Sequence, residues 1–199
     1  QHMERKLGIK IITGAPMKDI EVKGDSVTGC AGDQNLSAEM LLVAIGRKPV
    51  TEGLGLENAG LSTNDRGYIE IDEFCRTKVS SIYAVGDVTA GTTQLAHAAT
   101  SQGVTAAENA IGQRPAKTNP LVPACIFTSP EIGIVGVTEK KAKEDNLEVK
   151  TGKFMFAGLG KAMASGETTG FVKLVADAET DRLIGAQAVG PHATELISE

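Results

Sequence analysis

Residues 77–112 read TKVSSIYAVGDVTAGTTQLAHAATSQGVTAAENAIG: a short apolar segment, a Gly-Asp turn, a threonine-rich loop and a segment of small residues. The apolar segment 82–85 predicts a strand of an α/β sheet, and such sheets bind ligands beyond the carboxyl ends of their strands. Gly86 permits close approach of the backbone to a ligand, and the Asp87 carboxylate can accept hydrogen bonds from the hydroxyls of a sugar or sugar alcohol. A Gly-Asp pair alone also fits an ordinary turn before a packed helix. Its place between strand, loop and helix favours a binding site.

The small residues after the loop predict a helix with one nearly bare face, which can approach a sheet or a flat ring closely. Thr92 and Thr93 are candidate N-caps, and Gly112 is a candidate C-terminal glycine. The first turn of this helix would present unpaired N–H groups and the positive end of the helix dipole. A group that gains negative charge would be stabilised there. The residues of this turn are Gln94, Leu95, Ala96 and His97.

Composition indicates an ordinary globular protein. The 199 residues are 41% hydrophobic and 23% charged, with 23 glycines, which is typical of an α/β protein. The formal net charge of −5 argues against non-specific binding to nucleic acid or to anionic membranes. No apolar run approaches the ~20 residues that a membrane-spanning helix needs. We therefore expect no nucleic-acid partner and no membrane partner.

The three cysteines, Cys30, Cys75 and Cys125, are too far apart in sequence for a CxxC or CxxxxC motif. Neither a local redox disulphide nor a zinc knuckle is therefore expected. We predict free thiols, buried or half-buried, in a reducing compartment. His192 and Glu195 could form a metal pair or an acid–base dyad, but no other ligands have supporting spacing, so we expect no metal site.

The first part of the chain indicates β structure. The expected elements are strands at residues 8–12, 20–23, 26–28, 39–45 and 68–71, and a short helix at 56–59. The segment 39–45 is continuously apolar after Glu39, which is typical of a buried central strand. Pro49 ends it, because proline cannot donate to a β-ladder. Gly46 would again permit close approach at the carboxyl end of that strand.

The last part of the chain predicts an antiparallel sheet with helical inserts. Residues 113–123 contain three prolines and indicate a linker between domains. The elements expected after it are strands at 124–128, 132–137, 148–156, 170–176 and 182–189, and helices at 138–145 and 193–199, the first capped by Thr138.

Several motifs together resemble one family. They are Gly46-Arg47-x-Pro49, Gly86-Asp87, Leu95-Ala96-His97 with Gln102-Gly103, Thr128-Ser129-Pro130-Glu131-Ile132-Gly133, and Gly136-Val137-Thr138-Glu139. In this combination they resemble the pyridine nucleotide-disulphide oxidoreductases. The tail GFVKLVADAETDRLIGAQAVGPHATELISE, residues 170–199, is similar to the dihydrolipoamide dehydrogenases within that family. The resemblance covers residues 4–199.

The resemblance implies the domain order. Residues 4–50 would end an NAD-binding domain, and residues 51–117 would be the return segment of an FAD-binding domain. Residues 118–199 would be a dimerisation domain, truncated at its C-terminus. The implied fold class is the tail of an FAD/NAD(P)-binding α/β region, followed by an α+β domain with an antiparallel sheet and helices.

The resemblance also implies roles for individual residues. Asp87, with Gly86 before it, matches the aspartate that binds the ribityl chain of FAD. Residues 94–97 match the helix start whose backbone faces the pyrimidine edge of the flavin, and Gly46 matches a glycine that contacts NAD. Gln94 stands where many members carry Met, which matters little for a backbone contact.

The implied parent reaction is the oxidation of dihydrolipoamide by a cysteine pair, with electrons passing through FAD to NAD⁺. The family's cysteine pair, nucleotide fingerprints and catalytic His–Glu pair have no counterparts in this chain, so we expect no catalytic residue here. We expect the chain alone to be inactive and to bind no cofactor. A homodimer through residues 118–199 is expected, with the parent enzyme joining a 2-oxo acid dehydrogenase complex in a bacterial cytoplasm rather than a mitochondrial matrix. The alternatives are a non-catalytic dimerisation or interaction module, and a fragment of a mercuric or glutathione reductase.

Overall fold

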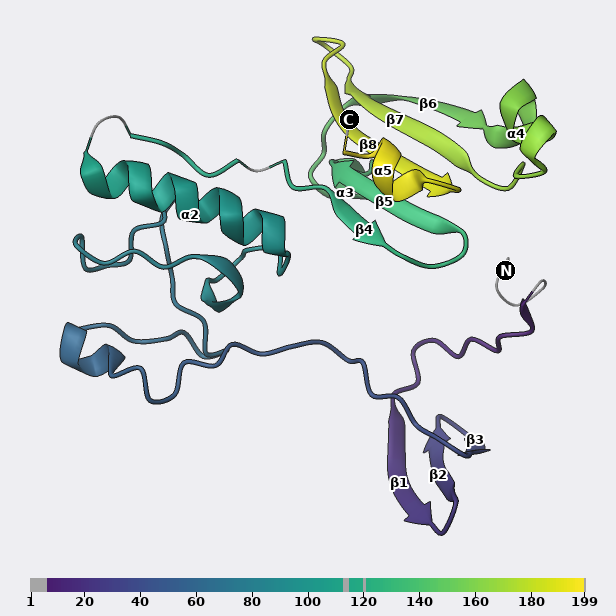
Figure 1. The fold of residues 1–199 in the computed structure, drawn as a ribbon, viewed down its shortest axis with the longest axis horizontal. Coiled ribbons are helices and arrows are strands. Elements are labelled where there is room, and N and C mark those ends of the chain that lie inside the picture. The colour runs from purple at the N-terminus through teal and green to yellow at the C-terminus, as the bar shows by residue number, and fades with distance from the viewer. Residues whose placement is uncertain (1–6, 113–114, 120, 199) are drawn as a thin grey trace. The chain divides into compact units, whose positions relative to one another are not determined.

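The computed structural model describes residues 7–112, 115–119 and 121–198 (Figure 1). The chain divides into two compact units, one ending at Arg47 and the other beginning at Lys48. Within the described ranges, no helix is both long enough and apolar enough to cross a membrane.

The first unit contains a three-stranded antiparallel sheet in the order β1-β2-β3 (Figure 1). Its strands are β1 (Met17–Lys23), β2 (Ser26–Ala31) and β3 (Gln34–Ala38). The predicted strands at 20–23 and 26–28 are confirmed as parts of β1 and β2, which pair across the turn at Gly24 and Asp25. Strand β3 was missed, although Gly32-Asp33 repeats the same turn signal one strand later.

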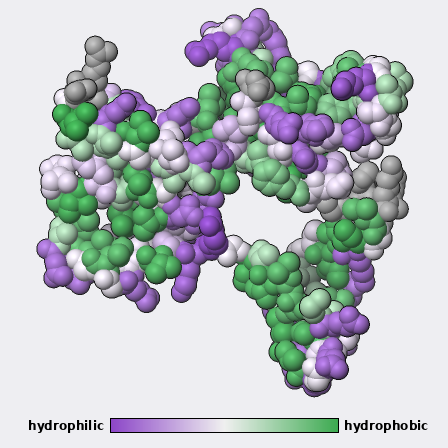
Figure 2. Space-filling model, in the orientation of Figure 1, coloured by the Kyte–Doolittle hydropathy of each residue, from purple (hydrophilic) through white to green (hydrophobic). Residues whose placement is uncertain are grey.

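Two strand predictions in this unit are wrong. Residues 8–12 and 39–45 belong to no strand, and the apolar side chains of the second segment are exposed, Leu42 by 88% and Ile45 by 95%. Figure 2 shows the apolar surface of the molecule in green. A strand exists only where a neighbour pairs with its N–H and C=O groups, and no described residue pairs with these segments in a β-ladder.

The second unit begins with loops and few regular elements. The predicted short helix is present as the 3-10 turn η1 (Leu56–Ala59), followed by Gly60 in the left-handed conformation. Residues 68–71 and 82–85 were predicted as strands, and both predictions are wrong. Each segment forms one isolated β-bridge: Ile69 of the first pairs with Thr89, and Tyr83 of the second pairs with Arg76. A single bridged pair does not make a strand.

Helix α2 (Ala96–Ile111) ends at Gly112, as predicted, with φ of 72°. Its buried residues recur at helical spacing and lie on one face: Ala98, Gln102, Thr105, Ala106 and Asn109. The Asn109 amide donates to the carbonyl oxygens of Phe74 and Ala116 and accepts the Ala116 N–H. The helix is thereby fixed to the loops on both sides of it.

The described part of the predicted linker, 115–119 and 121–123, contains no helix or strand; the rest of it lies outside the described residues. A five-stranded antiparallel sheet follows in the order β4-β5-β8-β7-β6 (Figure 1). Its strands are β4 (Ala124–Ile126), β5 (Glu131–Gly136), β6 (Val149–Met155), β7 (Phe171–Asp177) and β8 (Leu183–Gly190). All five were predicted, with ends differing by one or two residues.

Short helices accompany this sheet. The predicted α3 (Glu139–Glu144) is confirmed, with the Thr138 hydroxyl accepting the Lys141 N–H at 3.1 Å. Turn η3 (Phe156–Gly158) and helix α4 (Gly160–Ser165) were missed. Helix α5 (Ala193–Leu196) begins where predicted and is shorter than expected; residue 199, at the end of the predicted helix, lies outside the described residues.

The core of the sheet includes the fully buried Val175 and Ala188. Helix α5 packs against β5 at Gly133, where a Cβ would lie 2.5 Å from the Ala193 carbonyl oxygen and 2.8 Å from the Ile197 side chain. A glycine is therefore required for the helix to lie on the strand. The predicted fold class, the tail of an α/β region followed by an α+β domain with an antiparallel sheet and helices, is confirmed.

Candidate functional site

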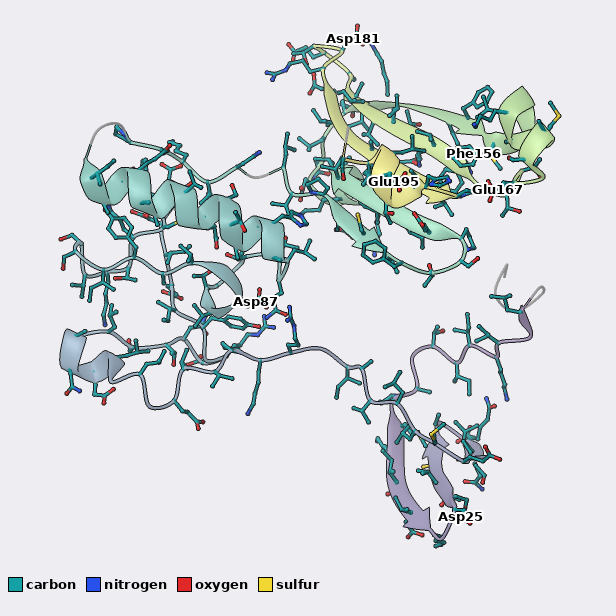
Figure 3. All side chains as sticks on the ribbon, viewed as in Figure 1. Asp25, Asp87, Phe156, Glu167, Asp181 and Glu195 are labelled. Atoms are coloured by element: carbon teal, nitrogen blue, oxygen red, sulfur yellow. The ribbon has the colours of Figure 1, made fainter. Side chains whose placement is uncertain are left out.

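Gly86 and Asp87 open the 3-10 turn η2 (Gly86–Val88), where Figure 3 labels Asp87. Gly86 has φ of 78°, a conformation that favours glycine. A Cβ at Gly86 would lie 3.2 Å from the Cβ of Ala99 on α2. The glycine therefore lets the turn lie against the helix, and its approach to a ligand stays a prediction.

Hydrogen bonds hold both ends of the turn. The Ile69 N–H donates to the Val88 carbonyl at 3.0 Å, and the Ile69 carbonyl accepts the Ala90 N–H at 2.9 Å. Thr89, only 1% exposed, donates its N–H and its hydroxyl to the Gly86 carbonyl. Asp87 is thus a half-buried carboxylate on a fixed turn, a group suited to accept from hydroxyl or amide donors.

Gln102 on α2 also contacts the turn. Gln102 is only 8% exposed, and its Oε1 accepts the Gly86 N–H at 2.6 Å. Gln102 belongs to one of the family motifs, but its bond to the turn was not predicted. The available signal was a long polar side chain on the helix face that otherwise carries small residues.

The start of α2 differs from the prediction. Its N-cap is Leu95, in an extended conformation and without a side-chain cap, so Thr92 and Thr93 are wrong as N-caps. The Thr92 hydroxyl is instead bonded to Gln102 and Thr89, and the Thr93 carbonyl accepts the Leu95 N–H. The residue at the N-cap thus supplies no side-chain cap, and binding of a negatively charged ligand atom by the first-turn amides stays a prediction.

The side chains of Gln94 and His97 point to protein partners. The Gln94 amide donates to the Tyr68 hydroxyl at 3.4 Å, and the His97 Nε2 lies 2.8 Å from the Pro123 carbonyl oxygen. A neutral His97 must then carry its proton on Nε2. Both side chains are therefore bonded to protein atoms, and the role of the backbone of residues 94–97 toward a cofactor stays a prediction.

Gly46 belongs to the other unit. Its φ is 114°, and no atom lies within 4 Å of where a Cβ would stand, so the backbone conformation alone explains the glycine. The structure brings residues 86–87 and 94–97 together in one unit and leaves the predicted role of Gly46 untested.

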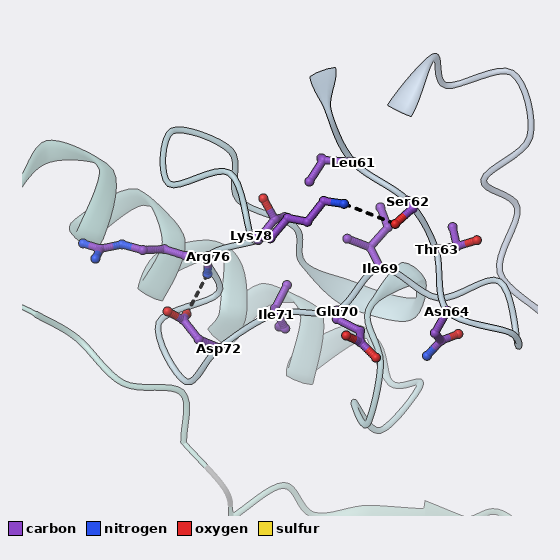
Figure 4. A pocket seen from close by; sticks show the side chains of 11 residues that line it. Leu61, Ser62, Thr63, Asn64, Ile69, Glu70, Ile71, Asp72, Arg76 and Lys78 are labelled. Carbon is purple, nitrogen blue, oxygen red and sulfur yellow. Dashed lines mark hydrogen bonds between the residues drawn. The ribbon is translucent and has the colours of Figure 1, made fainter. Parts of the chain in front are cut away.

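Several cavities lie in the second unit. One of about 380 Å³ is lined by Tyr68, Thr89 and Gln94 among others, and so adjoins the loop between Asp87 and α2. Another, of about 340 Å³, is shown in Figure 4, where the Lys78 ammonium donates to the Ser62 hydroxyl at 3.3 Å. Asp87 lines neither of these two cavities. Figure 4 also marks the bond from the Arg76 N–H to the Asp72 carboxylate, and we place no ligand there.

The predicted free thiols are confirmed: Cys75 is buried, and Cys30 and Cys125 are half-buried. Burial raises the pKa of the Cys75 thiol, with a contribution from Asp72. A hydrogen bond to Asp19, with lesser contributions from burial, raises the pKa of Cys30. A thiol with a raised pKa is a poor nucleophile at neutral pH, so neither residue is suited to redox chemistry.

The His192–Glu195 pair lies on the surface at the start of α5, with His192 Nδ1 3.3 Å from Glu195 Oε2. Beside it, the Glu131 carboxylate accepts the Thr194 N–H at 3.1 Å and the Thr194 hydroxyl at 2.6 Å, and these bonds lower the pKa of Glu131. This arrangement fixes the helix to the sheet. Among the described residues, no group of three or more His, Cys, Asp or Glu could hold a metal ion.

Comparisons with known proteins give two family models that match. The model for pyridine nucleotide-disulphide oxidoreductases matches residues 1–103, and the model for the dimerisation domain of the same family matches residues 122–199.

Several similar proteins are dihydrolipoyl dehydrogenases. A dihydrolipoyl dehydrogenase of Bacillus subtilis is 45% identical over 207 residues, which cover 98% of this chain and 42% of the relative. A dihydrolipoyl dehydrogenase of Haloferax volcanii is 46% identical over 169 residues, covering 84% of this chain and 36% of the relative. The chain thus spans less than half the length of the curated relatives that it matches.

Solved structures agree with this similarity. LpdA from Mycobacterium tuberculosis superposes with a TM-score of 0.90 at 31% identity, covering 99% of this chain and 43% of LpdA. The HOCl-induced flavoprotein disulfide reductase RclA of Escherichia coli gives a TM-score of 0.86 at 29% identity, covering 98% of this chain and 45% of RclA. The resemblance inferred from the motifs is confirmed.

Proposed function

The chain belongs to the pyridine nucleotide-disulphide oxidoreductase family, and we propose that it acts as part of a dihydrolipoyl dehydrogenase. In that role it supplies one side of the FAD site, a glycine of the NAD site and most of the dimerisation domain. The dihydrolipoyl dehydrogenases that match nearly the whole chain support this assignment.

Asp87 carries this proposal. It is half-buried on a turn that Ile69, Thr89 and Gln102 hold by hydrogen bonds, so its backbone has a fixed position before any ligand arrives. An acceptor-only group of this kind suits the hydroxyls of a ribityl chain. A charge-assisted hydrogen bond to a hydroxyl is stronger than a neutral one.

The uncapped start of α2 supports the second part of the site. Its first-turn amides can donate to the polar edge of the flavin, where the helix dipole would stabilise negative charge that develops on reduction. The bound FAD would carry electrons between a substrate dithiol and NAD⁺. Gly46, with its positive φ, would contact NAD through its backbone.

We assign no catalytic residue to this chain. The family's redox step needs two cysteines close in sequence, and Cys30, Cys75 and Cys125 lack that spacing. His192 pairs with Glu195 on the surface, and we assign to it only a structural role at the start of α5. We therefore propose that the isolated chain holds no flavin and has no turnover.

The match to the dimerisation-domain model supports self-association through residues 118–199. We propose a homodimer of the parent enzyme, its membership of a 2-oxo acid dehydrogenase complex, and a bacterial cytoplasmic location. Light scattering that finds a clean monomer of the chain would contradict the dimerisation.

A chimeric enzyme tests the FAD site. This chain replaces the matching segment of the Bacillus subtilis relative, and flavin content and dihydrolipoamide oxidation by NAD⁺ are measured. We expect a yellow, active protein. Asp87→Ala should weaken FAD binding by about tenfold to a hundredfold, since a hydrogen bond to a charged group contributes about 1.5–3 kcal/mol. The exposed Asp65→Ala is the matched control, and equal flavin content in both variants would contradict the assignment.

The second candidate is a non-catalytic dimerisation or interaction module. It is favoured by the separate match of residues 122–199 to a dimerisation domain. A chimera that folds and dimerises but stays colourless would favour this candidate. Measurable NADH–lipoamide turnover by the isolated chain would exclude it.

A further inference from the structure

Four hydrogen bonds form a closed ring through Gly86. The Gly86 N–H donates to Gln102 Oε1 at 2.6 Å, and Gln102 Nε2 donates to the Thr92 hydroxyl at 2.9 Å. The Thr92 and Thr89 hydroxyls lie 2.6 Å apart, and the Thr89 hydroxyl donates to the Gly86 carbonyl at 2.7 Å. The N–H and the C=O of Gly86 are therefore both part of this hydrogen-bonded ring, which connects the turn to α2.

Only one arrangement of protons satisfies this ring. The Gly86 N–H is a donor only, so Gln102 must turn its oxygen toward Gly86 and its NH₂ toward Thr92. The Thr89 proton is used on the Gly86 carbonyl, so the Thr92 hydroxyl must donate to Thr89. Each hydroxyl and the Gln102 amide then accepts one hydrogen bond and donates the next. Hydrogen bonds arranged in this way polarise and strengthen one another.

Gln102 has the reach and the place for this role. Its residue is buried on the face of α2 that lies against the turn, where a Cβ at Gly86 would stand 3.2 Å from the Ala99 Cβ. The small residue at 99 lets the turn approach the helix, and the longer side chain one turn further along reaches past it. Packing alone would be satisfied by an apolar side chain of this length.

We infer that Gln102 is a positioning residue for Asp87: by closing this ring with Thr92 and Thr89, it fixes the Gly86–Asp87 turn before a ligand binds. Its role toward flavin rests on the proposed function, whereas the ring itself can be tested on the ligand-free chain. The Gly86 N–H donates to Gln102, so the Gly86 amide is not available to the ligand.

The direct test is solution NMR of the isotope-labelled 199-residue chain. A scalar coupling across the hydrogen bond should connect the Gly86 amide nitrogen with the side-chain carbonyl carbon of Gln102. The Gly86 amide should also exchange with solvent more slowly than that of Gly91, a loop glycine in open surroundings. A Gly86 amide without this coupling that exchanges as fast as Gly91 would overturn the inference, and no variant is needed for this result.

Substitutions separate hydrogen bonding from packing. Gln102→Met keeps the length of the side chain and removes both polar ends, so exchange at Gly86 should accelerate by about two- to tenfold for one lost hydrogen bond. Gln102→Glu keeps an acceptor toward Gly86 and should retain protection. If Gln102 acted through packing alone, Gln102→Met would keep the Gly86 amide protected, and the buried charge of Gln102→Glu would make it exchange faster. That result would overturn the inference. Thr92→Val should shift the Gln102 side-chain NH₂ signals.

Asn109→Leu is the matched control, because Asn109 is a buried amide on the same helix that bonds to Phe74 and Ala116 instead of the turn. It should leave the Gly86 and Asp87 signals unchanged. In the chimera described above, Gln102→Met should bind flavin more weakly than the wild type, whereas Gln102→Glu should retain its flavin affinity. A colourless wild-type chimera refutes the proposed function, whereas an unprotected Gly86 amide refutes the role of Gln102.

Discussion

The contact between α5 and β5 gives a quantitative prediction for Gly133→Ala. The added methyl group would stand 2.5 Å from the Ala193 carbonyl oxygen and 2.8 Å from the Ile197 side chain. The carbonyl is backbone and cannot rotate away, so helix or strand must shift. Overpacking of this kind costs about 1–3 kcal/mol, which for a unit of this size lowers the melting temperature by about 2–12 °C.

Circular dichroism melting of the chain measures this change, with Gly152→Ala as the control. Gly152 lies in β6 of the same sheet and has no atom within 4 Å of its Cβ position, so its replacement should leave stability unchanged or slightly higher. Equal melting temperatures for the two glycine variants would refute the packing of α5 on β5.

Three further results are expected. The pKa of Glu131 is lowered in the folded protein, so its contribution to stability is present above the unfolded pKa and is lost as pH falls through the folded pKa. Glu131→Gln should therefore flatten the acid side of a plot of stability against pH. An unchanged plot would contradict the bond to Thr194. Thr138→Ala removes the cap on the Lys141 N–H and should cost about 0.5–2 kcal/mol, measured by urea unfolding, whereas Thr138→Ser should cost little. Cys75, fully buried with a raised pKa, should react with a thiol reagent more slowly than the other two cysteines; equal rates would contradict its burial.

Local chemistry was sufficient to predict the strands of the antiparallel sheet, because strand residues and the turns between them lie close together in sequence. The pairing of β5 with β8, which are far apart in sequence, was not predicted. The cap at Thr138 and the end of α2 at Gly112 were predicted for a similar reason: both depend on residues within one turn of the helix.

The predictions that failed depended on a partner elsewhere. The apolar run 39–45 predicts burial but does not say which residues will cover it. Thr92 and Thr93 have the chemistry of N-caps, yet the Thr92 hydroxyl bonds to Gln102, ten residues further along the chain. The ring through Gly86 likewise joins residues whose proximity only the packed helix creates, so sequence could mark Asp87 as a site but could not show what holds it.

The exposed segment around Leu42 and Ile45 has a consequence for the behaviour of the protein in concentrated solution. Strands of other molecules can pair with an apolar stretch that belongs to no β-ladder. This kind of association does not end in a closed oligomer, so it can continue into large aggregates. Turbidity should therefore grow with protein concentration independently of pairing through residues 118–199. Leu42→Lys, at a side chain already 88% exposed, should suppress it without loss of folded stability.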